Sequence, residues 1–322
     1  MHNKNKENLK KDTTVYKIWL FIYQHIILFI YKNILLFAYQ NSLLKLQGFI
    51  LNLQVSKVKQ NREKNIISKN DKSLLELKDS QKGKSCIIIG NGPSLQIEDL
   101  EKIYESNVIS FGLNQINQIY ENTVWRPDYF VLHDYGFLSK FSNQSEVDNY
   151  IKEIQDEQTK KVFLNSKTPK RLRSIINKKI LFFRIPIQKL NSKHLPQLSS
   201  DISLKIEDYG TVTSSAIQIA LYMGITKIYL IGQDFTYKEY IDIDGNYILD
   251  KKAKDYVKGL KGANNFSKYN CPDLRTAFRG FKKIKKYAED HGVEIVNVTR
   301  GGNLDIFERA SFEDVFDNSP NT

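Results

Sequence analysis

The stretch SCIIIGNGPSL, residues 85–95, carries the strongest fold signal in this 322-residue sequence. Four apolar residues run directly into Gly90-Asn91-Gly92-Pro93-Ser94. A short apolar run that stops at glycine and proline is typical of a buried strand followed by a tight turn. Glycine lets the backbone approach a ligand closely, and Ser94 can cap the next helix or meet an anion there. The pattern is neither the Walker motif nor the dinucleotide fingerprint, so a purely structural turn explains it about equally well.

From Ser85 onward, short apolar runs alternate with segments of helical spacing. We expect buried strands at residues 86–90, 108–112, 129–133, 161–165, 180–183, 227–232 and 293–298. We expect helices at 96–105, 214–224 and 272–292, and a β-hairpin around Asp244-Gly245 at 238–250. This alternation predicts an α/β fold, a Rossmann-like, mostly parallel sheet with flanking helices. We assign residues 84–318 to this domain and 319–322 to a tail.

The residues before this domain have a different composition. A polar, basic tail at 1–14 precedes an apolar segment at 15–55, in which an eight-residue unit repeats as IYQHIILF, IYKNILLF and AYQNSLLK. We expect one helix whose tyrosines and apolar bulk suit a membrane interface, so that it lies on or dips into the cytoplasmic leaflet. A membrane-spanning helix and a protein-binding helix are the alternatives. Residues 56–83 are expected to form a basic linker.

Composition narrows the class of protein without deciding it. Forty-eight Lys and Arg against 36 Asp and Glu give a formal charge of +12, which favours anionic partners or simply solvates the surface. The two cysteines, Cys86 and Cys271, lie far apart, so we expect a reducing compartment and no structural zinc. No cleavable signal peptide is expected. Nucleic-acid binding is disfavoured, because the positive charge in the tail and linker lacks interleaved aromatic residues.

Polar residues follow several of the expected strands. Parallel strands deliver ligands to the crevice outside their carboxyl ends, so these positions are candidates for a site. Asn114 can read a base or ribose, or form a turn. Asp234, with Phe235 and Tyr237 beside it, follows the strand at 227–232. A hydroxyl cluster suited to phosphate lines the start of the intervening helix, at Thr211, Thr213, Ser214 and Ser215.

A longer pattern resembles the MptE-like family. It consists of IIIGNGPSL, GLNQ, PDYFVLHD, YGTVTSSAIQIALYMGITKIYLIGQDF and YAEDHGVEIVNVTRGGNLDIFER, in this order, over about residues 84–315. The family is named for a 6-hydroxymethylpterin diphosphokinase and includes proteins of flagellin glycosylation and surface-polysaccharide synthesis. The resemblance implies a nucleotide-using enzyme.

Parts of the pattern are also similar to the bacterial lipooligosaccharide sialyltransferases, which bind CMP-sialic acid. The resemblance implies that the nucleotide sugar is held by Gly90 to Ser94, by Asn114, by Thr213 with Ser214, and by Asp234 with Phe235. It also implies catalysis without a metal. One departure concerns the histidine that these enzymes are proposed to use as a general base, because the corresponding stretch NNFSKYNCPD has Phe266 nearest that place.

Other residues must then deprotonate the acceptor. His133, Asp134 and Asp234 are candidates by their place at strand ends, although His133 and Asp134 can also form a structural hydrogen-bonding pair. Tyr237 or Tyr269 can donate to the leaving phosphate, as the resemblance implies. These five residues are our candidate catalytic groups.

Three functions follow from the sequence. The first is a membrane-associated glycosyltransferase that moves a sugar, such as a nonulosonic acid, from a CMP-activated donor to a surface-glycan or lipid-linked acceptor on the cytoplasmic side. The second is pyrophosphoryl transfer from ATP to a pterin, which needs Mg²⁺ and offers Asp134 and Asp234 as ligands. The membrane arm favours the first, since a soluble pterin gives no reason for an anchor. The third is a non-catalytic nucleotide-binding protein. No tightly bound cofactor is expected, and the sequence is compatible with an oligomer.

Overall fold

The computed structural model describes residues 46, 49–50, 52–134, 141, 143–168, 179–185, 195–250, 252 and 272–316. The chain divides into two compact units, Met1–Leu53 and Gln54–Thr322. Most of the apolar segment predicted at 15–55 lies outside the described residues, as do Tyr269 and Phe266. Within the described ranges, no helix combines the length and apolar character that crossing a bilayer requires.

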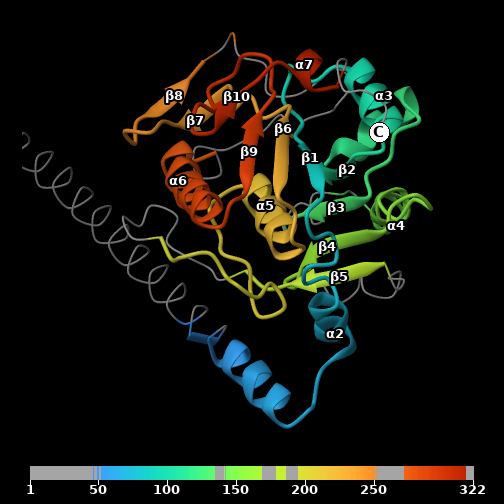
Figure 1. Cartoon of the computed structure of the whole chain (residues 1–322), viewed down its shortest axis with the longest axis vertical. Coiled ribbons are helices and arrows are strands. Elements are labelled where there is room, and N and C mark those ends of the chain that lie inside the picture. Colours follow the sequence, from blue (N-terminus) through green and yellow to red (C-terminus); the bar gives the residue numbers. More distant parts are fainter. Residues whose placement is uncertain are drawn as a thin grey trace, which may run out of the picture. The chain divides into compact units, whose positions relative to one another are not determined.

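The second unit is built on one eight-stranded parallel sheet in the order β10-β9-β6-β1-β2-β3-β4-β5 (Figure 1). Its strands are β1 (Ser85–Ile89), β2 (Ile109–Leu113), β3 (Tyr129–Leu132), β4 (Lys161–Asn165), β5 (Ile180–Phe183), β6 (Lys227–Ile231), β9 (Glu294–Asn297) and β10 (Glu308–Arg309). The Rossmann-like α/β fold predicted from the sequence is confirmed, and each of the seven strands expected in it is present to within one or two residues.

The direction in which the chain adds strands reverses at β1. From β1 the chain builds β2, β3, β4 and β5 on one side, and then returns through a crossover to place β6 on the other side of β1. The two strands pair in register from Ser85 with Lys227 to Ile89 with Ile231. In open α/β sheets, ligands bind outside the carboxyl ends of the strands at such a reversal. The fold therefore points to the loops that follow β1 and β6.

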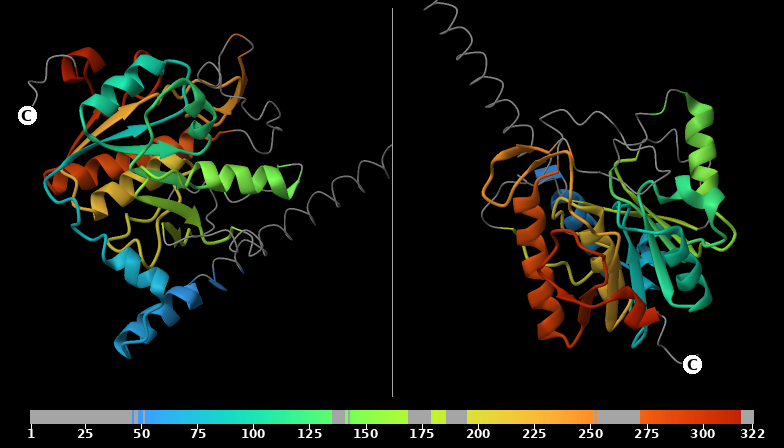
Figure 2. Two further views of the ribbon diagram at one scale, coloured as in Figure 1. Left: turned by 90° about the vertical axis from the view of Figure 1, so that its right-hand side faces the viewer. Right: turned by 90° about the horizontal axis from the view of Figure 1, so that it is seen from above.

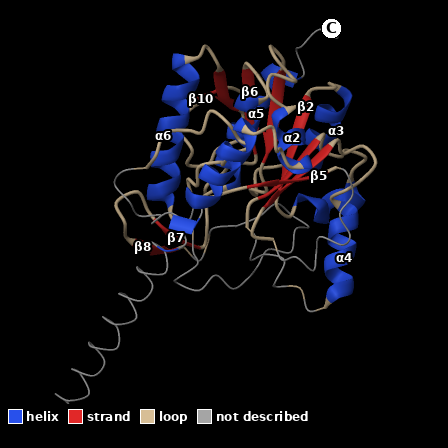
Figure 3. Cartoon of the chain, turned by 90° about the horizontal axis from the view of Figure 1, so that it is seen from below, coloured by secondary structure: helices blue, strands red, loops and turns tan. Residues whose placement is uncertain are grey.

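Helices cover both faces of the sheet (Figures 2 and 3). They are α2 (Lys69–Leu75), α3 (Ile97–Glu105), η1 (Ile116–Asn122), α4 (Gln144–Glu153), α5 (Val212–Tyr222), α6 (Leu274–Asp290) and α7 (Phe312–Phe316). One buried cluster joins α2, α5 and α6 to the sheet, and a second joins α3, η1, α4 and α7 to its other face. The unit is thus a three-layer α/β/α sandwich.

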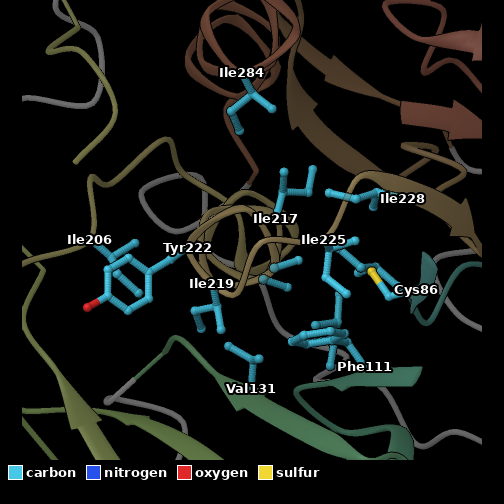
Figure 4. Close-up of a cluster of buried hydrophobic side chains, with 14 of the residues drawn as sticks. Cys86, Phe111, Val131, Ile206, Ile217, Ile219, Tyr222, Ile225, Ile228 and Ile284 are labelled. Carbon is cyan, nitrogen blue, oxygen red and sulfur yellow. The ribbon is translucent and has the colours of Figure 1, made fainter. Parts of the chain in front are cut away.

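The alternation of side chains along β1 explains why both faces are covered. Cys86 and Ile88 belong to the cluster under α5, whereas Ile87 and Ile89 belong to the opposite cluster, and all four side chains are fully buried. Figure 4 shows Cys86, Phe111 and Val131 on the side of the sheet that faces α5, with Val131 next to Ile219 of that helix. Complete burial of each such aliphatic side chain contributes about 1.5–3 kcal/mol to folding.

The hairpin expected at 238–250 is confirmed: it forms as β7 (Glu239–Ile241) and β8 (Tyr247–Leu249), which pair antiparallel. Other elements differ from the sequence expectations. Strand β10 has two exposed residues and therefore no apolar run to reveal it. Helix α2 lies inside the segment expected to be a linker, and its Leu74 is fully buried in the core. No helix is expected from the sequence at the positions of α2, η1, α4 or α7.

Candidate functional site

The loops that follow β1 and β6 are in direct backbone contact. The Gly90 N–H donates to the Ile231 carbonyl at 2.8 Å, and the Gly92 N–H donates to the Gly232 carbonyl at 2.9 Å, so the ladder between the two strands continues past their ends. A Cβ atom on Gly90 or Gly92 would lie closer than 3.0 Å to the Gly232 carbonyl oxygen. Only glycine fits at both positions, and the reason is this close approach.

Ser94 binds the carboxylate of Asp234 across these loops. Its backbone N–H donates to Oδ1 at 3.1 Å and its hydroxyl donates to Oδ2 at 2.8 Å. Ser94 does not cap the next helix, because α3 begins at Ile97 and Gln96 occupies its N-cap. The anion that Ser94 meets here belongs to the protein itself. Burial raises the pKa of the Asp234 carboxyl, and the hydrogen bonds from Ser94 oppose that shift.

Gln233 connects the end of β6 to the first turn of α5. Its Oε1 accepts from the Thr213 hydroxyl at 2.8 Å, and its backbone N–H donates to the Thr299 hydroxyl at 3.1 Å. Gln233 is only 4% exposed, and among the described residues its Nε2 has no hydrogen-bond partner. A buried amide donor without a partner costs about 1–3 kcal/mol. A hydrogen-bond acceptor on a bound ligand would satisfy this donor.

Asn91 and Asn114 place further amide oxygens at the same edge. The Asn91 Nδ2 donates to the Leu113 carbonyl at 3.0 Å, which ties the loop after β1 to the end of β2. Asn114 adopts a left-handed conformation with φ of 51°, and its backbone N–H donates to the Val131 carbonyl of β3. Within the part of the chain that the structure describes, the Oδ1 atoms of both residues are buried without a donor. The strand-end positions predicted from sequence thus converge over β6, β1, β2 and β3.

The hydroxyl groups at the start of α5 are largely engaged within the protein. Thr211 is the N-cap and accepts from the Ser214 N–H at 3.0 Å, while the Ser214 hydroxyl donates to the Thr211 carbonyl at 2.7 Å. Thr213, Ser214 and Ser215 are buried. The helix start still presents its positive dipole end to this edge of the sheet. Direct phosphate contact by the Ser214 hydroxyl would require breaking its bond to Thr211.

His133 lies at the end of β3 and contacts two groups. Its Nδ1 is 2.9 Å from the Ser215 hydroxyl, and its Nε2 is 3.6 Å from Oδ1 of Asp208. The side chains of His133 and Asp208 are 18% and 16% exposed, so both reach solvent. Asp134 is exposed beside them. The imidazole of His133 contacts Ser215 and Asp208, so the alternative in which His133 pairs with Asp134 is wrong.

The remaining predicted site residues lie in different surroundings. Pro93 is half-buried in the loop after β1. The Phe235 ring is 5% exposed and packs edge-on against Tyr237, Phe278 and Phe281, so it belongs to the core and does not face a ligand. Tyr237 packs against the same cluster. The prediction for Tyr269 falls outside the described residues.

The two carboxylates predicted as Mg²⁺ ligands do not fit one ion. Asp134 follows β3 and Asp234 follows β6, and β1 and β2 lie between these strands. Three strand spacings amount to about 14 Å, whereas Mg²⁺ binds its ligands at about 2.0–2.1 Å. Each oxygen of Asp234 also accepts a hydrogen bond from Ser94. Among the described residues, no group of three or more His, Cys, Asp or Glu is arranged to hold a metal ion.

Sequence reasoning missed several residues of this edge. Gln233 stands between the strand expected at 227–232 and Asp234, and its place at a strand end was the available signal. Gly302 and Asn303 pack on the Asp234 backbone, where the Asn303 N–H donates to the Asp234 carbonyl at 2.7 Å. The two consecutive glycines in TRGGN were the signal for this close approach. No sequence pattern marks Asp208, because it lies in an irregular loop.

One cavity lies elsewhere in the unit. It measures about 280 Å³ and is formed by the last turns of α6, the start of β9 and the approach to β10. Its lining residues are Lys285, Ala288, Glu289, Gly292, Val293, Glu294, Ile295, Phe307 and Glu308. This cavity is at the amino-terminal edge of the sheet, away from the loops that follow β1 and β6, and none of the predicted site residues lines it.

Comparison with known proteins identifies one family. The sequence model of the family described as "6-hydroxymethylpterin diphosphokinase MptE-like" matches residues 51–240. No curated protein matches the chain. Among solved structures, the Bordetella bronchiseptica enzyme WbmH in complex with NAD+ aligns with a TM-score of 0.23 and 11% identity, over 68% of this chain. The alignment spans 56% of the length of WbmH, and at this TM-score the likeness carries no functional argument.

Gly90→Ala tests the backbone contact between the loops. We expect this substitution to lower the free energy of unfolding by about 1–3 kcal/mol, because the new Cβ forces the loops apart. Gly301→Ala is the control: no atom lies within 4 Å of its Cβ, so it pays only the strain of its left-handed backbone, about 1–2 kcal/mol. Urea denaturation measures both, and a Gly90→Ala variant as stable as wild type would contradict the contact.

Asp234→Asn tests the buried carboxyl. The pKa of the Asp234 carboxyl is raised in the folded state. At pH values just above the ordinary pKa of 3.8, the folded protein therefore keeps the carboxyl proton, whereas the unfolded chain has lost it. The stability of wild type relative to Asp234→Asn is therefore greatest below pH 3.8 and falls as the pH rises through the folded pKa. Urea titrations at a series of pH values measure this difference, with exposed Asp314→Asn as control. A difference that grows with pH would refute the assignment.

Proposed function

The chain belongs to the MptE-like family, and on that premise we propose that it is a nucleotide-dependent transferase whose nucleotide binds outside the ends of β1, β2 and β6. The observation that carries this proposal is the shared edge built from the Gly90 and Gly92 backbones together with three buried amide atoms that lack protein partners among the described residues. These features lie where the strand order reverses, which is the place at which such sheets bind nucleotides.

The unpartnered atoms specify the chemistry of the ligand. The Oδ1 atoms of Asn91 and Asn114 need hydrogen-bond donors, and the Nε2 of Gln233 needs an acceptor. Ribose hydroxyls and a base amino group supply donors, whereas base carbonyls and phosphates supply acceptors. Since all three atoms are closed to solvent, the loops or side chains must open slightly to admit the ligand. Binding then satisfies groups whose burial otherwise costs about 1–3 kcal/mol each.

We further propose that the nucleotide activates a sugar, with a CMP-linked nonulosonic acid as the favoured donor. The motif similarity to the sialyltransferases supports this choice. The phosphate would lie near Gly90 to Ser94 and the start of α5, where the helix dipole favours negative charge. An acceptor hydroxyl would attack the anomeric carbon in a single displacement, with His133 as the base and Tyr237 or Tyr269 donating to the departing phosphate.

Pyrophosphoryl transfer is the second candidate, because the family is described by a diphosphokinase. That reaction requires Mg²⁺ to bridge the phosphates of ATP. Asp134 and Asp234 cannot share one ion, so this candidate needs carboxylates other than the pair predicted from sequence, or oxygen ligands supplied mainly by ATP and water. A non-catalytic role in nucleotide binding uses the same edge of the sheet and differs only in the absence of turnover.

We propose that the first unit attaches the enzyme to the cytoplasmic membrane surface. Its described residues Leu46, Phe49, Ile50 and Leu53 are helical and each at least 45% exposed. Their spacing of three and four residues places them on one face of the helix. An exposed apolar face continuous in sequence with the segment at 15–45 suits insertion into the headgroup region. Attachment would bring the enzyme to a lipid-linked acceptor, with the nucleotide sugar drawn from the cytosol.

Nucleotide binding can be measured by thermal shift of the full-length protein. We expect CMP to stabilise it without metal, by roughly 2.7 kcal/mol at 100 times its dissociation constant. UMP, GDP and ATP, each with and without Mg²⁺, complete the comparison. A shift with ATP that requires Mg²⁺ would favour the diphosphokinase. No shift with any nucleotide would contradict the proposed function.

Asn114→Ala and Asn107→Ala form a matched pair for the same assay. Both asparagines have a left-handed backbone, with φ of 51° and 54°, so both variants pay a similar strain. Only Asn114 lies at the proposed site, whereas Asn107 follows α3 at the other end of β2. We expect Asn114→Ala to reduce the CMP shift and Asn107→Ala to preserve it. Equal shifts in the two variants would place the nucleotide elsewhere.

Deletion of residues 1–53 tests the membrane attachment. We expect the full-length protein to sediment with vesicles that contain anionic lipid, and the truncated protein to remain in the supernatant, because the exposed apolar face is gone. The thermal melting of the truncated protein serves as the folding control. Undiminished sedimentation of a folded, truncated protein would show that another surface binds the membrane.

A further inference from the structure

Helix α6 carries a run of positive charge on its outer side. From Leu274 to Lys286 the helix contains six basic residues and no acidic residue: Arg275, Arg279, Lys282, Lys283, Lys285 and Lys286. Its apolar side packs in the same buried cluster as its neighbour α5 (Figure 3). The helix is therefore amphipathic, with a basic side in place of the mixed charges that usually cover an exposed helix face.

Four of these cations form what we call the basic stripe: Arg279, Lys282, Lys283 and Lys286. They follow one another at intervals of three, one and three residues, so that they share one face of the helix. Lys282 and Lys286 are exposed, whereas Arg279 and Lys283 are half-buried. The stripe extends over seven residues, or about 10 Å along the helix axis.

Three cations of the stripe are not compensated within the described part of the protein. The other three basic residues and Lys286 do not all share this property, because ion pairs join Arg275 to Asp273 at 3.0 Å, Lys285 to Glu289 at 3.9 Å and Lys286 to Asp290 at 3.2 Å. Arg279, Lys282 and Lys283 have no ion pair and no side-chain hydrogen bond to a described residue.

The elements packed around α6 do not neutralise these three cations. Their carboxylates are placed elsewhere: Asp208 near His133, Glu239 on the Tyr247 hydroxyl, Asp242 near Arg275, Glu294 on Lys227, Asp305 on Arg309, and Glu308 at the cavity that Lys285 lines. Within the described ranges, and with the β7–β8 hairpin included, the one carboxylate within 4 Å of the stripe is that of Asp290.

The basic stripe is unfavourable for the helix itself. Like charges three or four residues apart on a helix repel each other. Arg279 has this relation to both Lys282 and Lys283, and each of these has it to Lys286. Because the stripe does not stabilise the fold, an anionic partner that removes the repulsion gives a physical reason for it.

The positive charge of the chain is concentrated in two segments. Residues 1–84 contain 16 basic and 6 acidic residues, and residues 251–286 contain 12 basic and 2 acidic residues. Residues 85–250 and 287–322 together contain 20 basic and 28 acidic residues, so the rest of the chain is negative. An anionic surface would repel that remainder and attract α6.

A membrane leaflet suits this face better than a nucleic acid does. The stripe lies on the convex outside of a helix, and Phe281, the aromatic residue within it, is fully buried. It therefore offers no ring on which a base can stack. Basic clusters on amphipathic helices are typical of surfaces that bind anionic lipid headgroups.

Helix α6 also lies next to the proposed nucleotide site. Phe235, the residue after Asp234, packs edge-on against Phe278 and Phe281 on the inner side of α6. The basic stripe is on the other side of the same helix, about one helix diameter, or 10–12 Å, away. Contact between the stripe and a membrane would hold the loop after β6 within reach of a lipid-linked acceptor.

We propose that the basic stripe of α6 binds anionic headgroups of the membrane and holds the sheet-bearing unit against the lipid surface. The inference rests on the membrane attachment proposed for the first unit, and adds a second contact surface and the charge of the lipid that it recognises. Three uncompensated cations are too few to anchor a protein alone at physiological salt, so the stripe acts together with the first unit.

The test measures partition of the full-length protein onto two kinds of vesicle at physiological salt: phosphatidylcholine alone, and phosphatidylcholine mixed with phosphatidylglycerol. Each basic residue near an anionic leaflet changes the partition coefficient about fivefold. We therefore expect the triple variant Arg279→Gln, Lys282→Gln, Lys283→Gln to bind the anionic vesicles about a hundredfold more weakly, and the neutral vesicles unchanged. Glutamine keeps helix propensity and removes the repulsion, so thermal melting should show a folded protein.

A matched triple variant removes the same charge from other elements. Lys72→Gln, Lys82→Gln and Lys152→Gln change exposed lysines on α2, before β1 and on α4. We expect this variant to keep most of its affinity for the anionic vesicles. Equal losses in the two triple variants would show that net charge drives binding, and would overturn the proposal.

The other outcomes separate the stripe from the first unit. If wild type binds neutral and anionic vesicles equally, the attachment by the first unit stands and the role of α6 is overturned. If wild type binds neither, both proposals are overturned. If the α6 variant loses affinity for a DNA duplex and keeps its affinity for anionic vesicles, the stripe binds nucleic acid and the proposal is wrong.

Discussion

The contact between the loops after β1 and β6 is the constraint on which the rest of the structure depends. These strands meet where the chain reverses its direction of strand addition, and their backbones continue to pair beyond the strands through Gly90 and Gly92. Any side chain at Gly90 or Gly92 would separate them. Because the loops are locked together, Asp234 lies against Ser94, Gln233 faces Thr213, and Asn91 reaches the end of β2. The proposed nucleotide site is a consequence of that one approach.

Helix α5 connects this pair of loops to the strands beside them. Its apolar residues pack on β1, β2 and β3, while its first turn carries hydroxyl groups that bond to residues on both sides. Thr213 engages the β6 loop and Ser215 engages His133. One helix thus contacts both the proposed nucleotide site, through Thr213, and the proposed base His133, through Ser215. Sites supported in this way are held more accurately than sites built on loops alone.

The sequence predicts the framework well because buried parallel strands are short, apolar and bounded by turn residues. The runs that became β1 to β6 and β9 are of this kind, whereas β10 is exposed and short, and no pattern reveals it. Strand-end reasoning also finds Gly90, Asn114, His133 and Asp234, since the carboxyl ends of parallel strands share one edge. It does not predict which side chains contact one another. The bond from Ser94 to Asp234, the burial of Phe235 in the core and the place of Asp208 depend on tertiary packing between segments far apart in the chain.

The proposed nucleotide site lies at this edge of the sheet, and a crystal structure of the protein grown with CMP tests its position most directly. We expect the phosphate beside Gly90 to Ser94 and the start of α5, and the nucleoside within hydrogen-bond distance of Asn91 or Asn114. Nucleotide density in the cavity between α6 and β9, or on any face other than the carboxyl ends of β1, β2 and β6, would contradict it.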